Sequence, residues 1–449
     1  MDYRNMDMEL FGYSKKYNVE RFRVRVESSP TLDMKISEAV EVRIPKGFRA
    51  RLHALEGRSL TAGEIEALGK VLGSLLFPGT LADAVVANLN AVGSEQGLRI
   101  RLKLDDFVLA DLPWEYAWLQ QLQPVGFLAL NGRTSLVRYE QLSGLKNDLL
   151  PLGADAVRLA ALLADPQGFP EYSTLHLDVE VAKIREVLSR VNGLAADIQP
   201  WATVDALNKA LAQRPHILHF AGHGKFEKTE GKEFRSFEGK GYLVLLDEAQ
   251  GPHEFPVEKL VANLQGCGVR LAVLGACESA RRDGTNAWTG IGPALAQIGI
   301  PAVIGMQYSI RNANATTFSE HFYHALALGE SVDWAMNRAR LAIHNKSADL
   351  DERDWGVPVL YLRMRVEETE AVIFQRLVQP TQIAPPRQDI GVTSSVAVGH
   401  GAMCPHCGAP VKAGNKFCEQ CGAKLCPQCG AEVSATARFC GSCGTALGG

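Results

Sequence analysis

The chain has 449 residues, of which 46% are hydrophobic and 22% are charged, and its formal net charge is −3. This length corresponds to roughly two to four domains, and the composition is sufficient for at least one large core. The near-neutral charge provides no basic field of the kind that attracts nucleic acid or an anionic membrane.

The N-terminal residues 1–18 are charged and lack the apolar stretch of a signal peptide. No apolar run in the chain reaches about 18 residues, the length that a membrane-spanning helix needs. We therefore expect a cytoplasmic protein with no membrane partner. Thiols stay reduced in the cytoplasm, so the ten cysteines are expected to bind metal or to act in catalysis rather than to form disulfides.

We predict a mixed α/β region in residues 1–150. Its expected helices span residues 61–77 and 79–94, and its expected strands are RFRVRVESS, AVEVRIP, LRIRLKL, FVLADLP and TSLVRYEQL. We expect this region to extend the sheet of the following domain or to flank that sheet.

Residues 151–370 alternate short apolar runs with helical patterns. The expected strands are AVRLAALLA, ADIQPW, PHILHFAG, GYLVLLD, VRLAVLGA and IPAVIGMQYS. Helices are expected at residues 177–192, 203–213, 256–264, 290–298, 314–328 and 330–345. This alternation predicts an α/β domain with a largely parallel sheet and helices on both of its faces.

The C-terminal part consists of a linker and a cysteine-rich repeat. Residues 371–402 contain proline, serine and glycine without a periodic apolar face, and we expect a flexible linker there. Residues 403–449 hold two copies of a 22-residue unit, CPHCGAPVKAGNKFCEQCGAKL and CPQCGAEVSATARFCGSCGTAL. Each copy has two C-x2-C pairs separated by ten residues.

Paired C-x2-C turns are typical of structural zinc sites, because four thiolates complete a closed tetrahedral shell. A segment this short also buries too little surface to fold without such a site. We expect two structural zinc ions and no cofactor for catalysis; the alternative, a disulfide framework, would require export of the protein. The simplest pairing places Cys404, Cys407, Cys418 and Cys421 on one ion and Cys426, Cys429, Cys440 and Cys443 on the other.

The tail resembles the double zinc ribbons found at the ends of many bacterial proteins. It carries four basic residues, Lys412, Lys416, Lys424 and Arg438, which are too few for a convincing nucleic-acid site. The expected role of the tail is contact with an activator or another macromolecule. A folded cap without a ligand is the alternative.

Two cysteines, Cys267 and Cys277, remain outside the repeat. Cys277 ends one expected strand, and His223 follows the end of another, in PHILHFAGHGKF. Sites in an open parallel sheet form at the carboxyl ends of its strands. If the two strands are neighbours, His223 can activate the Cys277 thiol as a nucleophile. These residues alone favour a buried, structural Cys277 over a nucleophile, and we expect structural roles for Cys267, His216 and His219.

The motifs HFAGHG and LGACESA resemble the two active-site motifs of CHAT-domain proteases, which are relatives of caspases, separases and gingipains. GYLVLLDE, LADLPWEYAW and WGVPVLYLR extend the resemblance over roughly residues 60–365. It implies a caspase-like domain at 151–370 and a pseudo-caspase-like half at 1–150. It also implies that His223 is the catalytic histidine, that Cys277 is the nucleophile, and that the N–H groups of Gly224 and Cys277 form the oxyanion hole.

In this family, the segment that follows the helix after the cysteine forms part of the primary substrate pocket. Here that segment is MQYSIRNAN, residues 306–314. Many relatives carry tryptophan and aspartate in this stretch, whereas this chain has Tyr308 and Arg311. The form resembles that of caspases, in which an arginine receives an acidic side chain or the substrate backbone. Caspases place a glutamine where this chain has Gly275, so an acidic P1 preference and a solvated Arg311 both remain open.

The resemblance implies a cysteine endopeptidase that cleaves a specific protein substrate through a Cys–His dyad and an acyl-enzyme. We expect a role in bacterial regulation or defence, a substrate among the products of neighbouring genes, and an activator that contacts the zinc ribbon. The alternative is a non-catalytic adaptor that keeps the caspase fold and uses the ribbon for protein contacts. Nucleic acid is not an expected partner.

Overall fold

The computed structural model describes residues 2–31, 38–104, 106–139, 157–189, 194–228, 239–276, 288–346 and 352–363, together with short stretches of the tail at 402–403, 409–411, 415–426 and 433. The chain divides into two compact units, Met1–Pro380 and Thr381–Gly449.

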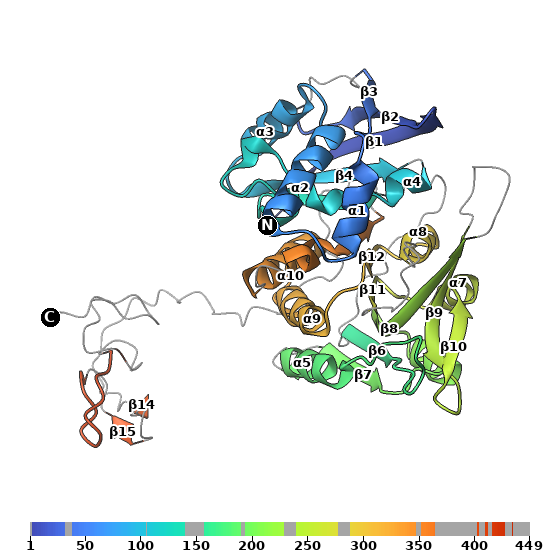
Figure 1. The fold of residues 1–449 in the computed structure, drawn as a ribbon. Coiled ribbons are helices and arrows are strands. Elements are labelled where there is room, and N and C mark those ends of the chain that lie inside the picture. Colours follow the sequence, from blue (N-terminus) through green and yellow to red (C-terminus); the bar gives the residue numbers. More distant parts are fainter. Residues whose placement is uncertain are drawn as a thin grey trace. The chain divides into compact units, whose positions relative to one another are not determined.

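The described part of the larger unit is organised around one sheet of 13 strands. The strands are β1 (Asp2–Lys16), β2 (Val19–Ser28), β3 (Val40–Arg43), β4 (Gln96–Leu104), β5 (Thr134–Tyr139), β6 (Val157–Leu163), β7 (Leu194–Gln199), β8 (Ile217–Lys228), β9 (Gly239–Leu246), β10 (Pro252–Pro256), β11 (Leu271–Ala276), β12 (Ala302–Met306) and β13 (Pro358–Leu362). Their order is β10-β9-β8-β11-β12-β13-β5-β4-β1-β2-β3, and β6 pairs with both β8 and β7 (Figure 1). Parallel pairs join β7, β6, β8, β11 and β12, and also β13, β5, β4 and β1.

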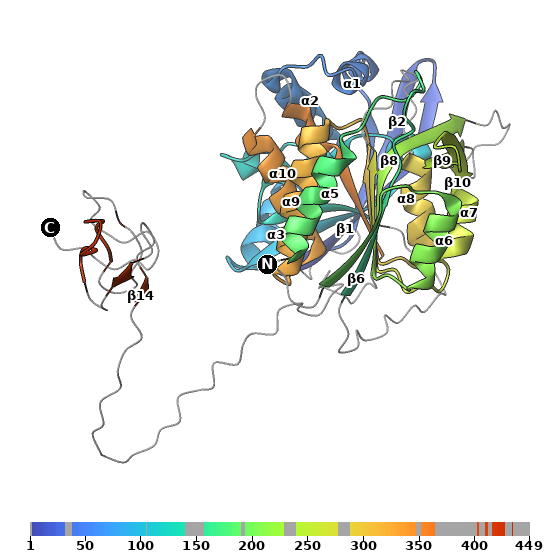
Figure 2. The same cartoon turned by 90° about the horizontal axis from the view of Figure 1, so that it is seen from below.

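Helices cover both faces of this sheet. The helices are α1 (Phe48–Glu56), α2 (Ala62–Leu76), α3 (Leu81–Ala91), α4 (Phe107–Ala110), α5 (Leu177–Ser189), α6 (Val204–Ala212), α7 (Val257–Leu264), α8 (Trp288–Gln297), α9 (Asn312–Ala327) and α10 (Val332–Lys346). Short 3-10 helices are η1 (Trp114–Tyr116), η2 (Gln120–Leu122), η3 (Leu128–Leu130) and η4 (Glu352–Gly356). In Figure 2, α5, α9 and α10 lie on one face and α6, α7 and α8 on the other. The predicted α/β class, with a largely parallel sheet between two helical layers, is therefore confirmed.

Polar residues at the predicted helix starts act as caps. Thr61 accepts a hydrogen bond from the N–H of Glu64, and the Glu64 carboxylate accepts one from the N–H of Thr61, which completes a capping box at α2. Thr203 caps α6 by accepting from the N–H of Ala206 at 3.1 Å. Such caps satisfy backbone donors that the first helical turn leaves unpaired.

Two predictions for the N-terminal half need correction. The expected strand FVLADLP contains helix α4 instead, because Asp106 accepts from the N–H of Val108 through its side chain and from Ala110 through its carbonyl. The charged N-terminal segment, for which no strand was expected, forms the long strand β1. It lies between β2 and β4, and this position buries alternate apolar residues such as Met6 and Met8.

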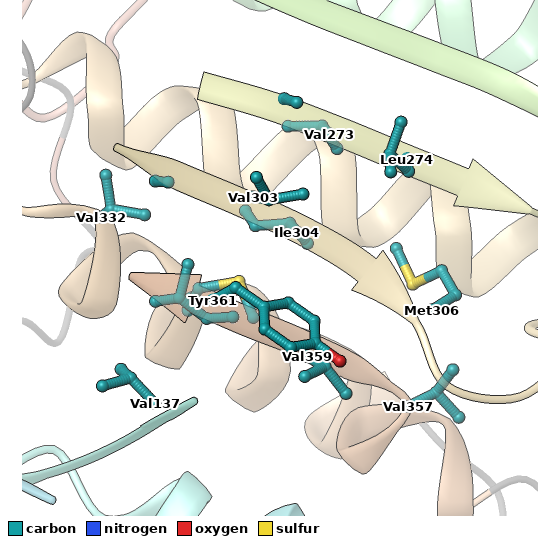
Figure 3. Packing of buried hydrophobic residues seen from close by; sticks show 14 of the residues in the cluster. Val137, Val273, Leu274, Val303, Ile304, Met306, Val332, Val357, Val359 and Tyr361 are labelled. Carbon is teal, nitrogen blue, oxygen red and sulfur yellow. The ribbon is translucent and has the colours of Figure 1, made fainter. Parts of the chain in front are cut away.

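The two halves of the larger unit share one core. Strand β13 pairs in parallel with β5 through Tyr361 with Arg138 and Leu362 with Tyr139. Figure 3 shows apolar side chains of β11, β12 and β13 packed together, with Val137 of β5 beside them. Each fully buried side chain of this kind contributes about 1.5–3 kcal/mol. The N-terminal half therefore completes the apolar packing of the second half and is part of the same folded body.

Buried ion pairs also join distant parts of the larger unit. Nε of Arg99, on β4, lies 2.5 Å from a carboxylate oxygen of Asp333, in the first turn of α10, and both side chains are fully buried. Arg101 pairs with Asp7 of β1, and Arg138 pairs with Glu115 of η1. A charge buried without its partner is strongly destabilising, so each pair helps to specify which elements pack together.

No single helix among the described residues is long and apolar enough to cross a membrane; α2 and α3 reach the required length and composition only as a pair bent by 88°.

The Arg99–Asp333 pair yields a prediction about stability. Replacing Asp333 by alanine is expected to lower the free energy of unfolding by about 3–5 kcal/mol, because Arg99 loses its counter-charge in the core. Urea denaturation followed by tryptophan fluorescence measures the change. Asp178→Ala is the matched control, since Asp178 also lies in a first helical turn but is exposed, and its expected loss is at most about 1 kcal/mol. Equal losses in the two variants would contradict the prediction.

Candidate functional site

The candidate site lies at the carboxyl ends of β11 and β12 and at the middle of β8. His223 was expected to follow the end of its strand, but β8 continues to Lys228 because it pairs with β9 from His223 onward. Strands β8 and β11 are parallel neighbours, and Gly222 is paired with Ala276. His223 directly follows Gly222, and Cys277 directly follows Ala276. The two strands are thus adjacent, as the dyad requires. Cys277 and the segment to residue 287 lie outside the described residues, so the contact between Cys277 and His223 stays a prediction.

The ring of His223 is fully buried, and one of its nitrogens is already bonded. Nε2 lies 3.0 Å from the carbonyl oxygen of Ser173, and the ring of Tyr172 packs against the imidazole with 5.1 Å between centroids. Because a carbonyl can only accept, Nε2 carries the proton in the neutral ring. Nδ1 is left with a lone pair and has no hydrogen-bond partner among the residues that the structure describes.

Burial lowers the pKa of His223, and the Ser173 carbonyl and the Asp165 carboxylate partly oppose this shift. The cause is desolvation, which disfavours the charged imidazolium. A lowered pKa keeps the ring neutral near pH 7, so that Nδ1 can accept a proton.

The chain that follows β6 carries Ser173 to the histidine. Oδ2 of Asp165 accepts from Nε2 of Gln167 at 3.0 Å and from the N–H of Leu175 at 3.2 Å. These bonds close the loop and place Ser173 over His223. Sequence reasoning missed Ser173, because a backbone carbonyl has no residue-type signature.

Gly224, the first predicted donor of the oxyanion hole, follows His223 within β8. It lies opposite Leu243 of β9, and His223 lies opposite Val244. The second predicted donor is the N–H of Cys277, outside the described residues. The oxyanion hole therefore stays a prediction.

His219 of β8, His216 just before that strand, and Cys267 have partners elsewhere. Nδ1 of His219 lies 2.8 Å from the Tyr323 hydroxyl, and Nε2 lies 3.4 Å from Glu180. Nδ1 of His216 accepts from the N–H of Arg158 at 3.0 Å. The Cys267 thiol donates to the carbonyl of Asn263, and burial raises the pKa of that thiol. These contacts agree with the structural roles expected for the three residues.

Tyr308 and Arg311, the predicted pocket residues, follow β12 at the same edge of the sheet. Tyr308 is half-buried, and the guanidinium carbon of Arg353 lies 5.4 Å from its ring centroid. Burial raises the pKa of Tyr308 far above its usual value, so the phenol stays protonated. The side chain of Arg311 is exposed, and its backbone N–H donates to Asp354 at 3.1 Å.

The smaller unit contains a turn suited to a thiolate-bound metal. Of the eight predicted ligands, Cys418 and Cys426 are buried and Cys421 is exposed; the other five, Cys404, Cys407, Cys429, Cys440 and Cys443, lie outside the described residues. The N–H of Gly422 donates to the carbonyl of Cys418 at 2.8 Å, and Gly422 has φ 73°, a left-handed conformation that favours glycine. Cys418 and Cys421 therefore sit on one tight turn, as C-x2-C zinc ligands do.

A family model assigns the larger unit. Residues 66–365, more than half of the chain, match the CHAT domain. The chain belongs to the CHAT family. Residues 404–444 match the double zinc ribbon, which agrees with the resemblance of the tail. A search of curated protein sequences found no match.

Several solved structures of proteases resemble this CHAT protein. The separase of a Saccharomyces cerevisiae separase–securin complex matches with 11% identity and a TM-score of 0.42, over 80% of this chain and 30% of that one. Porphyromonas gingivalis RgpB matches with 12% identity and a TM-score of 0.39, over 75% and 80%. The Drosophila initiator caspase Dronc matches with 9% identity and a TM-score of 0.30, over 46% and 79%. The CHAT protein spans less than a third of the separase chain.

The surroundings of His223 predict its tautomer and its titration. In a Cys277→Ala variant, we expect a proton on Nε2, none on Nδ1, and a titration midpoint below the ordinary value of about 6.5. Acidification through this range should destabilise the fold, since the unfolded chain binds the proton first. Long-range ¹H–¹⁵N NMR of histidine-labelled protein, assigned with His223→Gln, measures both properties. A protonated Nδ1 in the neutral ring, or a midpoint above 6.5, would contradict the prediction.

Proposed function

We propose that this CHAT protein is a cysteine endopeptidase in which His223 and Cys277 form the catalytic dyad. The observation that carries the proposal is the state of the buried His223 imidazole. Within the described residues, only its Nε2 atom makes a hydrogen bond. His223 directly follows Gly222, and Gly222 is paired with Ala276 on the neighbouring strand. The next residue after Ala276 is Cys277. A thiol there would supply the partner that Nδ1 needs.

The proposed chemistry uses one proton that moves between the two side chains and the substrate. His223 takes the thiol proton of Cys277 on Nδ1, and the thiolate attacks the scissile carbonyl. The N–H groups of Gly224 and Cys277 stabilise the oxyanion. The imidazolium then protonates the leaving amine, and a thioester forms. His223 next removes a proton from water, the resulting hydroxide attacks the thioester, and the departing thiolate recovers the proton.

We further propose that Arg311 and Tyr308 contribute to the substrate pocket and favour an acidic side chain at P1. The exposed guanidinium of Arg311 and the protonated phenol of Tyr308 are both donors suited to a carboxylate. A peptide-library profile tests this proposal. Enrichment of Asp or Glu at P1 that disappears in Arg311→Ala supports it, and a profile without acidic enrichment that Arg311→Ala leaves unchanged contradicts it.

The biological setting is also a proposal. A protease of this kind would act in the bacterial cytoplasm, in regulation or defence, on one protein substrate from a neighbouring gene, and the zinc ribbon would contact its activator. Co-expression of wild type and Cys277→Ala with the neighbouring gene products tests this, because cleavage of the substrate should be lost in the variant. The non-catalytic adaptor remains the second candidate.

The reactivity of Cys277 separates the enzyme from the adaptor. We expect iodoacetamide to label Cys277 at least about tenfold faster than Cys267 at pH 7, because an imidazole partner favours the thiolate whereas burial raises the pKa of Cys267. His223→Gln should remove most of this difference. Peptide mass spectrometry measures both cysteines in the same sample, so Cys267 is the internal control. Equal labelling of the two cysteines in wild type would contradict the protease proposal.

The metal content of the tail gives an independent prediction. The full chain should contain two zinc ions, with Cys418→Ser and Cys440→Ser each reducing the content to about one, because each residue belongs to a different proposed site. Elemental analysis of the purified proteins measures this, and Cys267→Ser is the control that should keep two. A single ion in wild type, or retention of both ions in Cys418→Ser, would contradict the proposed ligand sets.

A further inference from the structure

The segment that follows β12, residues 307–311, is held by charged groups that come from outside the second half's own strands. Its most unusual contact is at the carbonyl of Ser309, which accepts from two guanidinium groups. Nη2 of Arg58 lies 2.9 Å away, and Nη2 of Arg353 lies 2.8 Å away. Hydrogen bonds from charged donors are roughly twice as strong as neutral ones, so this carbonyl is fixed more firmly than that of an ordinary loop.

Arg58 also acts on the next part of the segment through Asp354. Its Nη1 lies 2.8 Å from Oδ1 of Asp354, a carboxylate that is fully buried. Oδ2 of the same carboxylate accepts from the N–H of Arg311 at 3.1 Å and from Nδ2 of Asn314 at 2.8 Å. One guanidinium therefore contacts both the Ser309 carbonyl and the carboxylate that holds the Arg311 N–H.

Further contacts fix the beginning of the segment. Nη2 of Arg138 donates to the side-chain oxygen of Gln307 at 3.0 Å, and the Gln307 amide donates to the carbonyl of Asp111 at 2.8 Å. The backbone N–H of Gln307 donates to Val357 at 2.9 Å. Alternate residues, Gln307, Ser309 and Arg311, thus each have a backbone group held in place.

Residues 112–118, LPWEYAW, contact the arginines that hold this segment. Glu115 pairs with Arg138 at 2.9 Å, and the Tyr116 hydroxyl donates to the carbonyl of Arg353. The ring of Tyr116 also packs against Trp355, with 4.9 Å between centroids. The N-terminal half therefore orients both arginines, Arg138 and Arg353, that reach the segment.

Arg58 itself lies 251 residues before Ser309 in the sequence. It follows the end of α1 with φ 56°, in the left-handed region that a non-glycine residue rarely adopts, and its side chain is 15% exposed. The residues that match the CHAT domain begin at 66, after Arg58.

We propose that Arg58 is a positioning residue for substrate binding, because it fixes the backbone that carries Tyr308 and Arg311; this inference rests on the proposed protease function. Arg58 does not touch the reacting atoms. It lies in the N-terminal half and fixes the backbone of the proposed pocket residues. The N-terminal half therefore holds the pocket segment in place and also forms part of the core.

The test compares two kinds of reagent on Cys277 in the full chain. Iodoacetamide is small and reports the reactivity of the thiol, whereas peptidyl acyloxymethyl ketones with Asp, Arg or Leu at P1 also need the pocket. Arg58→Met keeps the length of the side chain and removes the charge and the hydrogen bonds. We expect it to slow labelling by the best peptidyl probe at least about tenfold while the iodoacetamide rate stays within about twofold.

Arg51→Met is the matched control, because Arg51 lies exposed on the adjacent helix α1 and the same change is made there. It should alter neither rate. Equal slowing of both reagents in Arg58→Met, or slowing of neither, overturns the inference about Arg58 alone. Iodoacetamide labelling of wild-type Cys277 no faster than that of Cys267 overturns the protease proposal and this inference together.

A second variant, Arg58→Lys, tests the inference if Arg58→Met does not fold. Arg58→Lys keeps the charge, but one ammonium group cannot contact the Ser309 carbonyl and the Asp354 carboxylate in the same forked geometry. If Arg58→Met shows no cooperative thermal transition, Arg58→Lys should slow the peptidyl probe about threefold or more with an unchanged iodoacetamide rate. Equal rates for wild type and Arg58→Lys with the peptidyl probe overturn the inference.

Discussion

The position of His223 depends on a change of pairing partners along β8. The first half of β8 lies between β6 and β11 in parallel register, and from His223 onward it pairs with β9 instead. His223 therefore stands where the neighbours of the strand change. β6 ends at Leu163, and the chain that leaves it returns with Ser173 over the imidazole. A side chain at such a point is buried by the sheet and still faces the edge where sites form.

The same sheet carries the support for the proposed pocket. Because β12 is parallel to β11, residues 307–311 emerge at the edge of the sheet where β11 ends and where His223 follows the parallel part of β8. Because β13 pairs with β5, the N-terminal half lies beside that segment, and Arg58 and Arg138 can reach it. The geometry of the pocket segment thus depends on pairing between parts of the chain that are far apart in sequence.

The local sequence pattern was sufficient to predict the strands and helices of the second half of the larger unit, but not all of those in the first half. Strand and helix alternate clearly after residue 151, and nearly every expected element forms there. LRIRLKL was correctly predicted as a strand, but its residue pattern does not indicate which groups its arginines meet. Arg99 and Arg101 are buried, because Asp333 and Asp7 reach them from α10 and β1. The contacts of Ser173 and Arg58 also leave no signal in the local sequence. Ser173 acts through its backbone carbonyl, and Arg58 contacts Ser309, which lies 251 residues later in the chain.

The state of His223 bears on the choice between enzyme and adaptor. Nδ1 of His223 has no hydrogen-bond partner among the described residues, and a buried polar atom in that state costs about 1–3 kcal/mol. The Ser173 carbonyl and the Asp165 carboxylate offset only part of the pKa lowering that burial causes. A non-catalytic scaffold has no need of the lone pair on Nδ1, because the hydrogen bond from Nε2 to the Ser173 carbonyl already holds the ring. A hydrolase needs this arrangement, because Nδ1 must accept and release a proton while Nε2 holds the ring in place. The state of His223 therefore supports the proposed protease over the adaptor, and the reactivity of Cys277 tests that choice because an imidazole base beside the thiol would raise it.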